Sequence, residues 1–223
     1  MKALVAWSGG KDGAWALHLA RHDGLEVAGL LTTTANGRVA MHEVRGALIE
    51  AQAAAAGLPL WTVPLPWPCP NSAYEAAMRA ALQRARKDGI DAVVFGDLFL
   101  ADIRAYRESL LAGTGVRPSF PVWGKDTRAL ASEMIARGLR ATLVCVDLAR
   151  LPAHFAGRDF DAALLTDLPE GCDPCGENGE FHTFAWAGPM FRAPVPIERG
   201  AVEERGGFAF ADLLPAGSPP CRS

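Results

Sequence analysis

Apolar residues in the first hundred positions fall in short runs that are separated by longer segments of mixed character. Four runs are rich in aliphatic and β-branched residues, which predicts buried strands: 3–7, 25–33, 60–63 and 91–95. Between them, positions 14–20, 42–56 and 72–87 have patterns that predict helices. Strands that alternate with helices are typical of an α/β protein, in which helices cover both faces of a parallel sheet.

The segment from Ser72 to Lys87 has the clearest helical pattern. Ser72 and Glu75 have the spacing of a capping box at its N-terminus. Apolar side chains recur at helical spacing, which predicts a buried core face rather than a cofactor site: Tyr74, Ala77, Met78, Ala81, Leu82 and Ala85. Gly57 is a natural end for the preceding helix, and 34–41 is expected to be a loop with a turn at Asn36-Gly37.

The strict alternation stops near residue 98, and the second half of the chain is less regular. Helices are predicted over 101–112 and 126–137, an extended segment over 118–123, and a strand over 141–147. Beyond 148, short elements alternate with loops. We therefore expect two domains, 1–98 and 99–223, which pack tightly together because no flexible linker separates them.

A glycine-rich loop, Ser8-Gly9-Gly10-Lys11-Asp12, joins the first predicted strand to the first helix. Its glycines let the backbone approach an anion closely, and the helix N-terminus offers free N–H groups and a positive dipole. Lys11 adds a full charge and Ser8 a hydroxyl donor. The adjacent glycines differ from Walker A spacing. We interpret this loop as a phosphate site rather than an ordinary tight turn.

Gly96 and Asp97 follow the fourth predicted strand. Ligands of parallel sheets bind beyond the carboxyl ends of the strands, so these residues are expected to share a cleft with the glycine-rich loop. Asp12 and Asp97 are candidate ligands of Mg²⁺, which takes one or two carboxylates together with phosphates. Capping of the next segment is the alternative role for Asp97. Lys11 is expected to stabilise charge on a departing phosphate group.

Three charged residues on the helix predicted at 101–112 are candidate substrate contacts: Arg104, Arg107 and Glu108. Arg104 and Glu108 have i,i+4 spacing, so a simple surface ion pair is the alternative.

The stretch 171–183 is too polar and too rich in glycine for a core element, and loops of this kind often carry function. Glu177 and Glu180 are candidate catalytic residues, and Asn178, His182 and Thr183 are candidate substrate contacts. Cys172 and Cys175 form one CxxC motif. Because zinc usually takes four ligands, reduced structural cysteines are favoured over a zinc site or a redox pair.

Composition narrows the function further. The chain has 223 residues, of which 50% are hydrophobic, and a formal net charge of −3, which argues against a broad basic surface for nucleic acid. The basic run 84–87 is expected to be a solvated helix end. No apolar run approaches the roughly 20 residues that span a bilayer. Five cysteines, an odd number, and the lack of a signal peptide before the first strand predict a cytoplasmic protein with reduced thiols.

Taken together, these motifs resemble the diphthine–ammonia ligase family of the ATP pyrophosphatase (PP-loop) superfamily. The chain looks like the bacterial branch of that family. The resemblance extends over most of residues 1–191, through the loop 8–12, Gly96-Asp97, the segments 120–123 and 126–137, and above all the signature 176–183. It implies a HUP-type parallel sheet with helices on both faces and a smaller α+β C-terminal domain.

The resemblance also implies a reaction. An ATP-dependent ligase of this family adenylates a carboxylate with Mg²⁺ present, releases pyrophosphate and passes the acyl group to ammonia or an amine. Loop 8–12 then matches the pyrophosphate loop, Gly96 and Asp97 the strand-end motif, and 176–180 with Thr183 the C-terminal signature. Two departures are Gly13, where serine is common, and the segment 102–108. The acceptor is expected to be a small molecule or a protein that carries a carboxylate.

Two other functions are kept as alternatives: a regulatory module that binds ATP without turnover, and a tRNA-modifying PP-loop enzyme. The polar signature 176–183 favours an enzyme over a sensor. The negative net charge and the lack of a zinc-ribbon set of cysteines argue against tRNA. A homodimer is the default expectation for such an enzyme.

Overall fold

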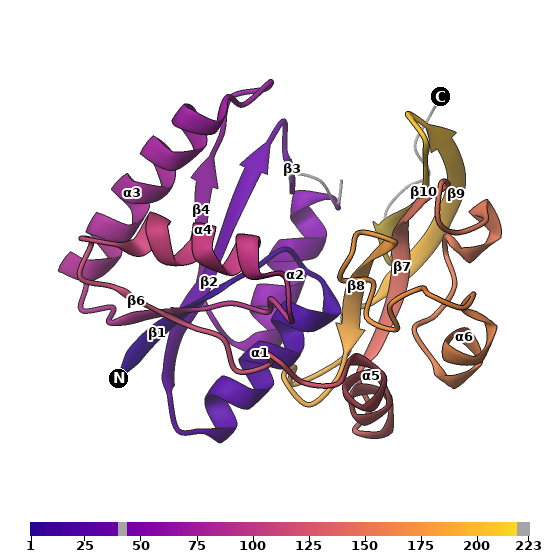
Figure 1. The fold of residues 1–223 in the computed structure, drawn as a ribbon. Coiled ribbons are helices and arrows are strands. Elements are labelled where there is room, and N and C mark those ends of the chain that lie inside the picture. Colours follow the sequence, from indigo (N-terminus) through magenta and orange to yellow (C-terminus); the bar gives the residue numbers. More distant parts are fainter. Residues whose placement is uncertain (40–43, 218–223) are drawn as a thin grey trace.

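The computed structural model of the chain describes residues 1–39 and 44–217. Its first part is a parallel sheet with helices on both faces, and its second part is an antiparallel sheet with helices beside it (Figure 1). This is the predicted fold class. None of the helices within the described ranges is long and apolar enough to cross a membrane.

The first sheet has five parallel strands in the order β4-β2-β1-β5-β6, and short β3 pairs antiparallel with the end of β2. The strands are β1 (Lys2–Ala6), β2 (Glu26–Ala35), β3 (Arg38–Val39), β4 (Leu60–Pro64), β5 (Ala92–Val94) and β6 (Arg117–Ser119). The helices are α1 (Lys11–His22), α2 (Gly46–Ala56), α3 (Asn71–Lys87) and α4 (Ala101–Leu111). The strand order reverses at β1 and β5, which is where ligands of open α/β sheets bind.

Alternate residues of β1 pack on opposite faces of the sheet, as a strand requires. Ala3 and Val5 belong to a buried cluster with α1 and α2, whereas Leu4 belongs to a second cluster with α3 and α4. All three side chains are fully buried. Both faces of the parallel sheet are therefore covered, which explains why its strands read as continuous apolar runs.

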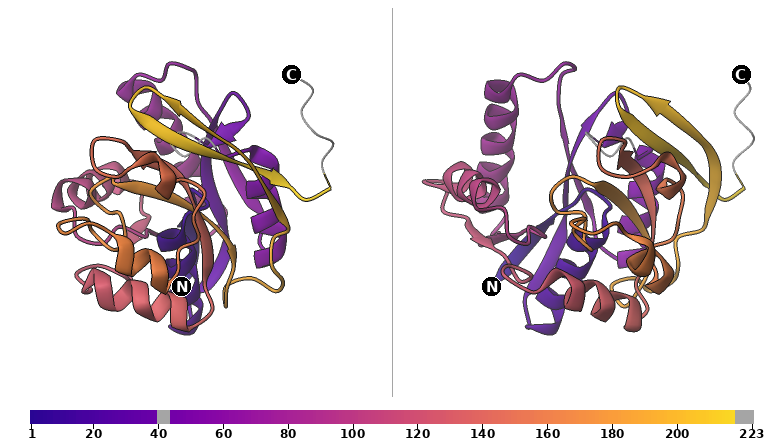
Figure 2. Two further views of the ribbon diagram at one scale, coloured as in Figure 1. Left: turned by 90° about the vertical axis from the view of Figure 1, so that its right-hand side faces the viewer. Right: turned by 45° about the vertical axis from the view of Figure 1, so that its right-hand side comes forward.

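The second sheet is antiparallel in the order β8-β7-β10-β9. Its strands are β7 (Arg140–Asp147), β8 (Phe181–Ala187), β9 (Ile197–Arg205) and β10 (Phe208–Pro215), and its helices are α5 (Thr127–Ala136), α6 (Ala162–Asp167) and a 3₁₀ turn at Ala153–Phe155. The β9–β10 hairpin lies on the outside of the molecule (Figure 2). The Asp126 side chain accepts a hydrogen bond from the Ala129 N–H and caps α5.

The predicted capping box of α3 is wrong. The helix begins one residue earlier, at Asn71, and Pro70 occupies the N-cap position without a side-chain cap. The Pro70 carbonyl accepts the N–H groups of Ala73 and Tyr74, so the first turn of the helix begins at the proline and Ser72 lies inside the helix. The apolar face of α3 is confirmed, with Met78, Leu82 and Ala85 buried and Tyr74, Ala77 and Ala81 half-buried.

The segment 34–41 is not the predicted continuous loop. β2 continues to Ala35, and Asn36 and Gly37 turn the chain with positive φ angles of 50° and 74° into β3. Two central residues with positive φ suit a tight hairpin, so the turn signal was correct but its second strand was missed. The helix predicted over 42–56 begins at Gly46. Residues 40–43, which the loop and helix predictions also covered, lie outside the described ranges.

Several predicted features of the second half also change. The extended segment predicted over 118–123 overlaps the strand β6 only at 118–119, and 121–124 forms turns. Strands β8, β9 and β10 were not predicted, so the end of the signature 176–183 lies on β8 rather than in a loop. Because α4 and β6 pack with the first sheet, we propose that the domain division lies between β6 and α5 rather than after residue 98.

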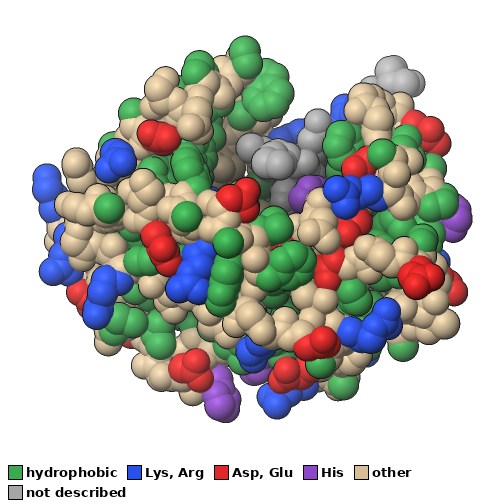
Figure 3. Space-filling view, viewed as in Figure 1, with side chains coloured by type: hydrophobic (Ala, Val, Ile, Leu, Met, Phe, Trp, Pro, Cys, Tyr) green, Lys and Arg blue, Asp and Glu red, His purple; other side chains and the backbone are tan. Residues whose placement is uncertain are grey.

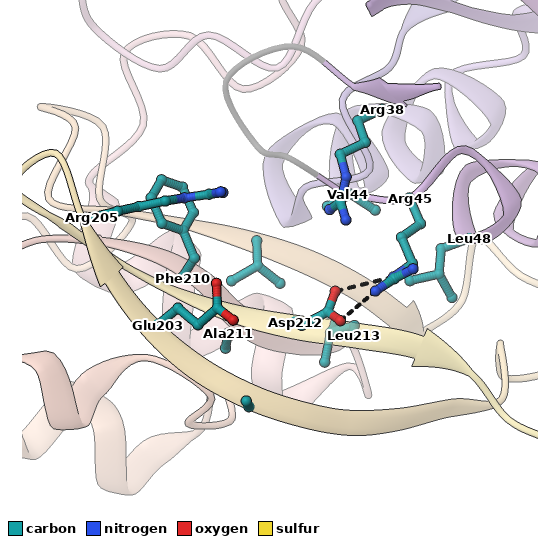
Figure 4. Close-up of a pocket in the computed structure, with 12 residues that line it drawn as sticks. Arg38, Val44, Arg45, Leu48, Glu203, Arg205, Phe210, Ala211, Asp212 and Leu213 are labelled. Carbon is teal, nitrogen blue, oxygen red and sulfur yellow. Dashed lines mark hydrogen bonds and ion pairs between the residues drawn. The ribbon is translucent and has the colours of Figure 1, made fainter. Parts of the chain in front are cut away.

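The two parts share one apolar cluster, which extends from β1, α1 and α2 to β7, β8 and β10. Arg45, at the start of α2, donates to both carboxylate oxygens of Asp212 on β10 at 3.1 and 2.6 Å (Figure 4). Gln52 of α2 is fully buried. Its amide nitrogen donates to the carbonyls of Gly9 (2.9 Å) and Ala185 (2.6 Å), so it ties the glycine-rich loop to β8.

We predict that Gln52→Leu lowers the free energy of unfolding by about 1–3 kcal/mol, because it leaves buried backbone carbonyls without this donor. Gln83→Leu is the matched control, since Gln83 is exposed on α3. Denaturant unfolding of both variants measures the difference. Equal stability of the two variants would contradict the role assigned to Gln52.

Candidate functional site

The glycine-rich loop, the end of β5 and the signature segment meet around a cavity of about 350 Å³ at the carboxyl ends of β1 and β5. The molecule is hollowed between the side built by α3 and α4 and the side built by the second sheet (Figure 3). The predicted residues that line this cavity are Ser8, Gly10, Lys11, Asp12, Gly96, Asp97, Arg107, Glu177, His182 and Thr183.

Gly9 is a buried residue of the loop and does not line the cavity, and its φ of 85° is a backbone conformation that favours glycine. A Cβ atom there would come within 2.7 Å of the Ile49 side chain. The Gly9 carbonyl accepts from the Gln52 amide and from the Ala185 N–H, both at 2.9 Å. Hydrogen bonds from α2 in the first part of the chain and from β8 in the second part thus fix the loop.

Gly96 brings the second strand end against the loop. A Cβ atom on Gly96 would lie 2.7 Å from the backbone of Asp12 and of Gly13. No side chain fits there, so glycine is required at this position. The prediction that Gly96-Asp97 and the loop 8–12 share one cleft is correct.

Lys11 is the buried cation of the site, with 2% of its side chain exposed. Its ammonium donates to Asp12 at 2.8 Å and to the Cys175 carbonyl, and it lies 5.3 and 5.5 Å from the ring centres of Phe160 and Phe181. Burial lowers the pKa of Lys11, but attraction to Asp12 and to other acidic groups outweighs burial and raises it above the ordinary value. Lys11 therefore stays charged.

Thr183, on β8 of the second sheet, caps the N-terminus of α1. Its hydroxyl oxygen accepts a hydrogen bond from the Lys11 N–H at 3.1 Å, and its side chain is buried. This is an N-cap contact supplied by a residue 172 positions away in the sequence. The backbone N–H of Lys11, in the first turn of α1, therefore has its hydrogen-bond partner only when β8 is packed against α1.

Asp97 lies between the loop and α4. Its carboxylate is 3.6 Å from the Arg107 guanidinium, which also lies 3.4 Å from the Tyr74 hydroxyl and 5.2 Å from the centre of the Phe95 ring. Burial raises the pKa of Asp97, and the attraction of Arg107 only partly opposes this. Arg107 thus remains a candidate to contact a substrate, beside Asp97.

Glu177 connects the signature segment to the end of β5. Its carboxylate accepts the N–H groups of Leu98 (2.7 Å) and Phe99 (3.4 Å). Burial and the nearby Asp12 carboxylate raise the pKa of Glu177 to about 7, although the two backbone N–H groups and Lys11 oppose the shift. A carboxyl group with this pKa exchanges protons near neutral pH, which suits acid–base chemistry.

Glu180 and Asn178 do not line the cavity. Glu180, with 2% of its side chain exposed, accepts hydrogen bonds from the Asp173 N–H and the Asn178 amide, both at 3.1 Å. The Asp173 carboxylate in turn accepts the N–H groups of Cys175 (3.2 Å) and Glu177 (2.9 Å). These contacts hold the loop that presents Glu177, so Glu180 and Asn178 position the signature rather than face the cleft.

Arg104 and Glu108 are also outside the cavity lining. They form an ion pair with each other at 2.8 Å, as the alternative interpretation of their spacing proposed. The Arg104 guanidinium lies over the rings of Phe120 and Trp123, at 4.9 and 4.7 Å. Arg107 is thus the residue of this predicted trio that reaches the cavity.

Comparison with known proteins places this site in a family. The model of the diphthamide synthase N-terminal domain matches residues 1–118, and that of the diphthamide synthase C-terminal domain matches residues 126–210. The chain belongs to the diphthamide synthase family. The resemblance drawn from the sequence motifs is thereby confirmed, and the two matches are separated by the residues that link β6 to α5.

Curated relatives of this diphthamide synthase family member carry the name diphthine--ammonia ligase. The protein from Danio rerio is 32% identical over 56% of this chain and 51% of its own length. The protein from Bos taurus is 23% identical over 96% of this chain and 89% of its own length. The human protein is 26% identical over 57% of this chain. The chain thus spans about half the length of the zebrafish and human relatives that it matches.

Among solved structures, one described as a predicted subunit of tRNA methyltransferase from Methanocaldococcus jannaschii aligns with a TM-score of 0.42 and 16% identity. The alignment covers 65% of this chain and 80% of that chain.

An apolar part of the cavity lining was missed by the sequence analysis. Tyr74, Met78 and Leu82 of α3 line the cavity together with Ile103 of α4. The interpretation of the α3 face as core and not a ligand site is therefore incomplete. Helical spacing shows that a face is buried, but it cannot show whether protein or a cavity covers each turn.

His182 and Cys175 also line the cavity, and their protonation states follow from their burial. Burial and the neighbouring Lys11 lower the pKa of His182, so its imidazole is neutral at pH 7. Cys172 and Cys175 are free thiols, and the Cys175 Sγ lies 3.4 Å from the Thr127 carbonyl. Burial raises the pKa of Cys172 to about 11, and the pKa of Cys175 is raised still further. Both thiols are protonated at neutral pH and are poor nucleophiles.

We predict that Glu177→Gln stabilises the protein at high pH and not at low pH. The folded protein binds the Glu177 proton up to a pKa of about 7, against 4.5 for an ordinary glutamate, so folding is favoured below 4.5 and this advantage is lost as the pH rises through 7. Glutamine cannot ionise and can still accept from Leu98. Thermal unfolding at about pH 5 and about pH 8 measures the effect.

The melting temperature of Glu177→Gln relative to the parent chain should be higher at the upper pH than at the lower one. Glu170→Gln, at an exposed position, is the control and should show no such change. A difference between Glu177→Gln and the parent that does not vary with pH would contradict the raised pKa.

Proposed function

We propose that the chain is an ATP-dependent ligase that adenylates a carboxylate, releases pyrophosphate and transfers the acyl group to ammonia. One observation carries this proposal: a phosphate-type loop and a carboxyl group with a pKa of about 7 face the same cavity. The names of the curated relatives, diphthine--ammonia ligase, support ammonia as the nitrogen donor.

The β- and γ-phosphates of ATP would bind at loop 8–12. The N-terminus of α1 supplies N–H groups and a positive dipole end, and Lys11 supplies a buried charge beside them. Because the charge on pyrophosphate grows as it departs, these groups stabilise the transition state more than the bound ATP.

Asp12 and Asp97 fit a magnesium ion that arrives with ATP. Each has a buried carboxylate oxygen without a hydrogen-bond partner, Oδ1 of Asp12 and Oδ2 of Asp97, and the latter lies 3.6 Å from the Arg107 guanidinium. Among the described residues, no group of three His, Cys, Asp or Glu side chains is arranged to hold a metal. Phosphate oxygens would therefore supply further ligands, as is usual for Mg²⁺, which would neutralise phosphate charge.

The first step would form an acyl-adenylate. A carboxylate oxygen of the acceptor attacks the α-phosphorus of ATP, and the bond to the β-phosphate oxygen breaks to release pyrophosphate. Arg107 is the candidate to bind the acceptor carboxylate, because it lies at the cavity beside Asp97. The apolar wall of Tyr74, Met78 and Leu82 would exclude water from the reactive mixed anhydride.

The second step would form the amide. The nitrogen of ammonia attacks the acyl carbon, the bond from that carbon to the oxygen of AMP breaks, and the nitrogen loses one proton. Glu177 is the candidate base for this proton, since its pKa of about 7 leaves it partly ionised at neutral pH. Its two backbone hydrogen bonds hold it in place at the cleft.

Product analysis tests the reaction class. Incubation with ATP, Mg²⁺, ammonium and a panel of carboxylates should yield AMP and pyrophosphate in equal amounts, together with an amide. ADP and phosphate as products would contradict the proposal. ATP binding without turnover for any acceptor would favour a regulatory module, and salt-sensitive tRNA binding would favour a tRNA-modifying enzyme.

We predict that Lys11→Ala abolishes AMP formation while the protein stays folded, because the cation beside the departing pyrophosphate is lost. Lys87→Ala, at an exposed position of α3, should keep the activity of the parent chain. AMP release is measured with circular dichroism as the check of folding. A folded Lys11→Ala variant with undiminished AMP formation would rule out this role.

A further inference from the structure

The strand β9 is a long exposed edge of the second sheet. Within the described residues, β10 is the strand that pairs with it, and residues 198–205 are all exposed. The hairpin lies on the outside of the molecule in both views of Figure 2. An edge strand of this length presents a row of backbone N–H and C=O groups to which another strand can pair.

A bulge in β9 changes which of its residues share a face. Gly200 and Ala201 both lie opposite Asp212, since the register shifts between Ala211 and Leu213. The extra residue moves the alternation of faces by one. Arg199 therefore shares a face with Glu204, which it would not do in a regular strand of the same length.

On the other face, Glu198 and Arg205 lie together. Glu198 is opposite Leu214 of β10 and Arg205 is opposite Phe208, two positions of β10 on one face. Arg205 and Asp212 lie on the same side of the hairpin in Figure 4, which agrees with this assignment.

This pattern makes β9 complementary to itself. When two copies of β9 run antiparallel about a two-fold axis at Val202, with the bulged Gly200 and Ala201 filling one position, Glu198 faces Arg205 of the second copy on one face of the sheet. Arg199 faces Glu204 of the second copy on the other face. The symmetry repeats both pairs, so four pairs of opposite charge form.

We propose that β9 is a homodimerisation edge, which joins the antiparallel sheets of two copies into one continuous sheet. Val202, which has 48% of its side chain exposed, would lie at the centre, where the flanking charged pairs exclude water. A shift of the pairing by two residues would set Glu198 against Glu203 of the second copy, so the charges also select the register.

The charged side chains already have contacts within the chain, and these are compatible with the pairing. Arg199 contacts Asp159, Glu198 accepts from the Gly217 N–H at 3.0 Å, and the Arg205 guanidinium lies 4.4 Å from the ring centre of Phe210. A guanidinium has five N–H donors and a carboxylate several acceptor positions, so each can bind a second partner. A charged edge with one sign would prevent pairing, but this edge carries both signs: Glu198, Glu203 and Glu204 together with Arg199 and Arg205.

One pair of edge strands makes a smaller interface than the roughly 1,600 Å² of a typical stable complex. The dimer is therefore expected to be weak and to depend on concentration. Sedimentation velocity of the full chain should show monomer at low concentration and dimer as the concentration rises to about 200 μM. A chain that stays monomeric over this whole range would overturn the proposal.

Two variants of β9 with edges of opposite charge test the proposed pairing. Glu198→Arg/Glu204→Arg makes all four paired positions of the edge positive, and Arg199→Glu/Arg205→Glu makes all four negative. Each variant alone should stay monomeric, because like charges would meet. An equimolar mixture should form a heterodimer, because every pair is then opposite in sign. A mixture that stays monomeric, or a single variant that dimerises as the parent does, would overturn the proposal.

Two controls separate charge pairing from other effects. Glu50→Arg/Glu170→Arg changes the net charge as the positive variant does, at exposed positions outside β9, and should dimerise like the parent. The fourfold exchange Glu198→Arg/Arg199→Glu/Glu204→Arg/Arg205→Glu restores complementarity within one chain and should dimerise again. Failure of the fourfold variant while it stays folded would contradict the pairing.

Discussion

The shape of the glycine-rich loop depends on the hydrogen bonds that the Gly9 carbonyl accepts. It accepts one N–H from Gln52 in the first part of the chain and one from Ala185 in the second. A buried carbonyl without such donors would be costly, so the loop keeps its shape only where both parts meet. The phosphate-type loop is therefore made by the whole molecule, although its motif belongs to one short segment.

The electrostatics of the cleft follow from the same arrangement. One buried cation, Lys11, faces the Asp12 carboxylate, the Cys175 carbonyl and, further away, Glu177. Burial and the Asp12 carboxylate raise the pKa of Glu177 to about 7 although this cation opposes the shift, so Glu177 exchanges protons near neutral pH. Burial thus raises the pKa of Glu177 towards neutral pH, whereas Lys11 stays charged because attraction to Asp12 and other acidic groups outweighs its burial.

Local patterns predicted the first half of the fold well, because each parallel strand is buried on both faces and each helix has one buried stripe. They failed where long-range packing decides the outcome. The N-cap of α3 is Pro70 and not Ser72, so the predicted capping box does not form. The strand β8 begins at Phe181, within a segment whose polar and glycine-rich composition predicted a loop. Glu180 is buried there because Oε1 accepts from the Asp173 N–H and the Asn178 amide and lies 3.8 Å from the Arg150 guanidinium, contacts that spacing along the chain does not show.

The sequence by itself determined the glycine-rich loop, the strand-end Gly96-Asp97 and the signature that brings Glu177 and Thr183 to the cleft. Each is a local motif whose residue types are required by backbone geometry or charge. The tertiary structure alone decided that Thr183 caps α1, that Arg107 rather than Arg104 reaches the cavity, and that α3 supplies an apolar wall. Those facts depend on which surfaces face one another after folding, and spacing along a chain does not encode that.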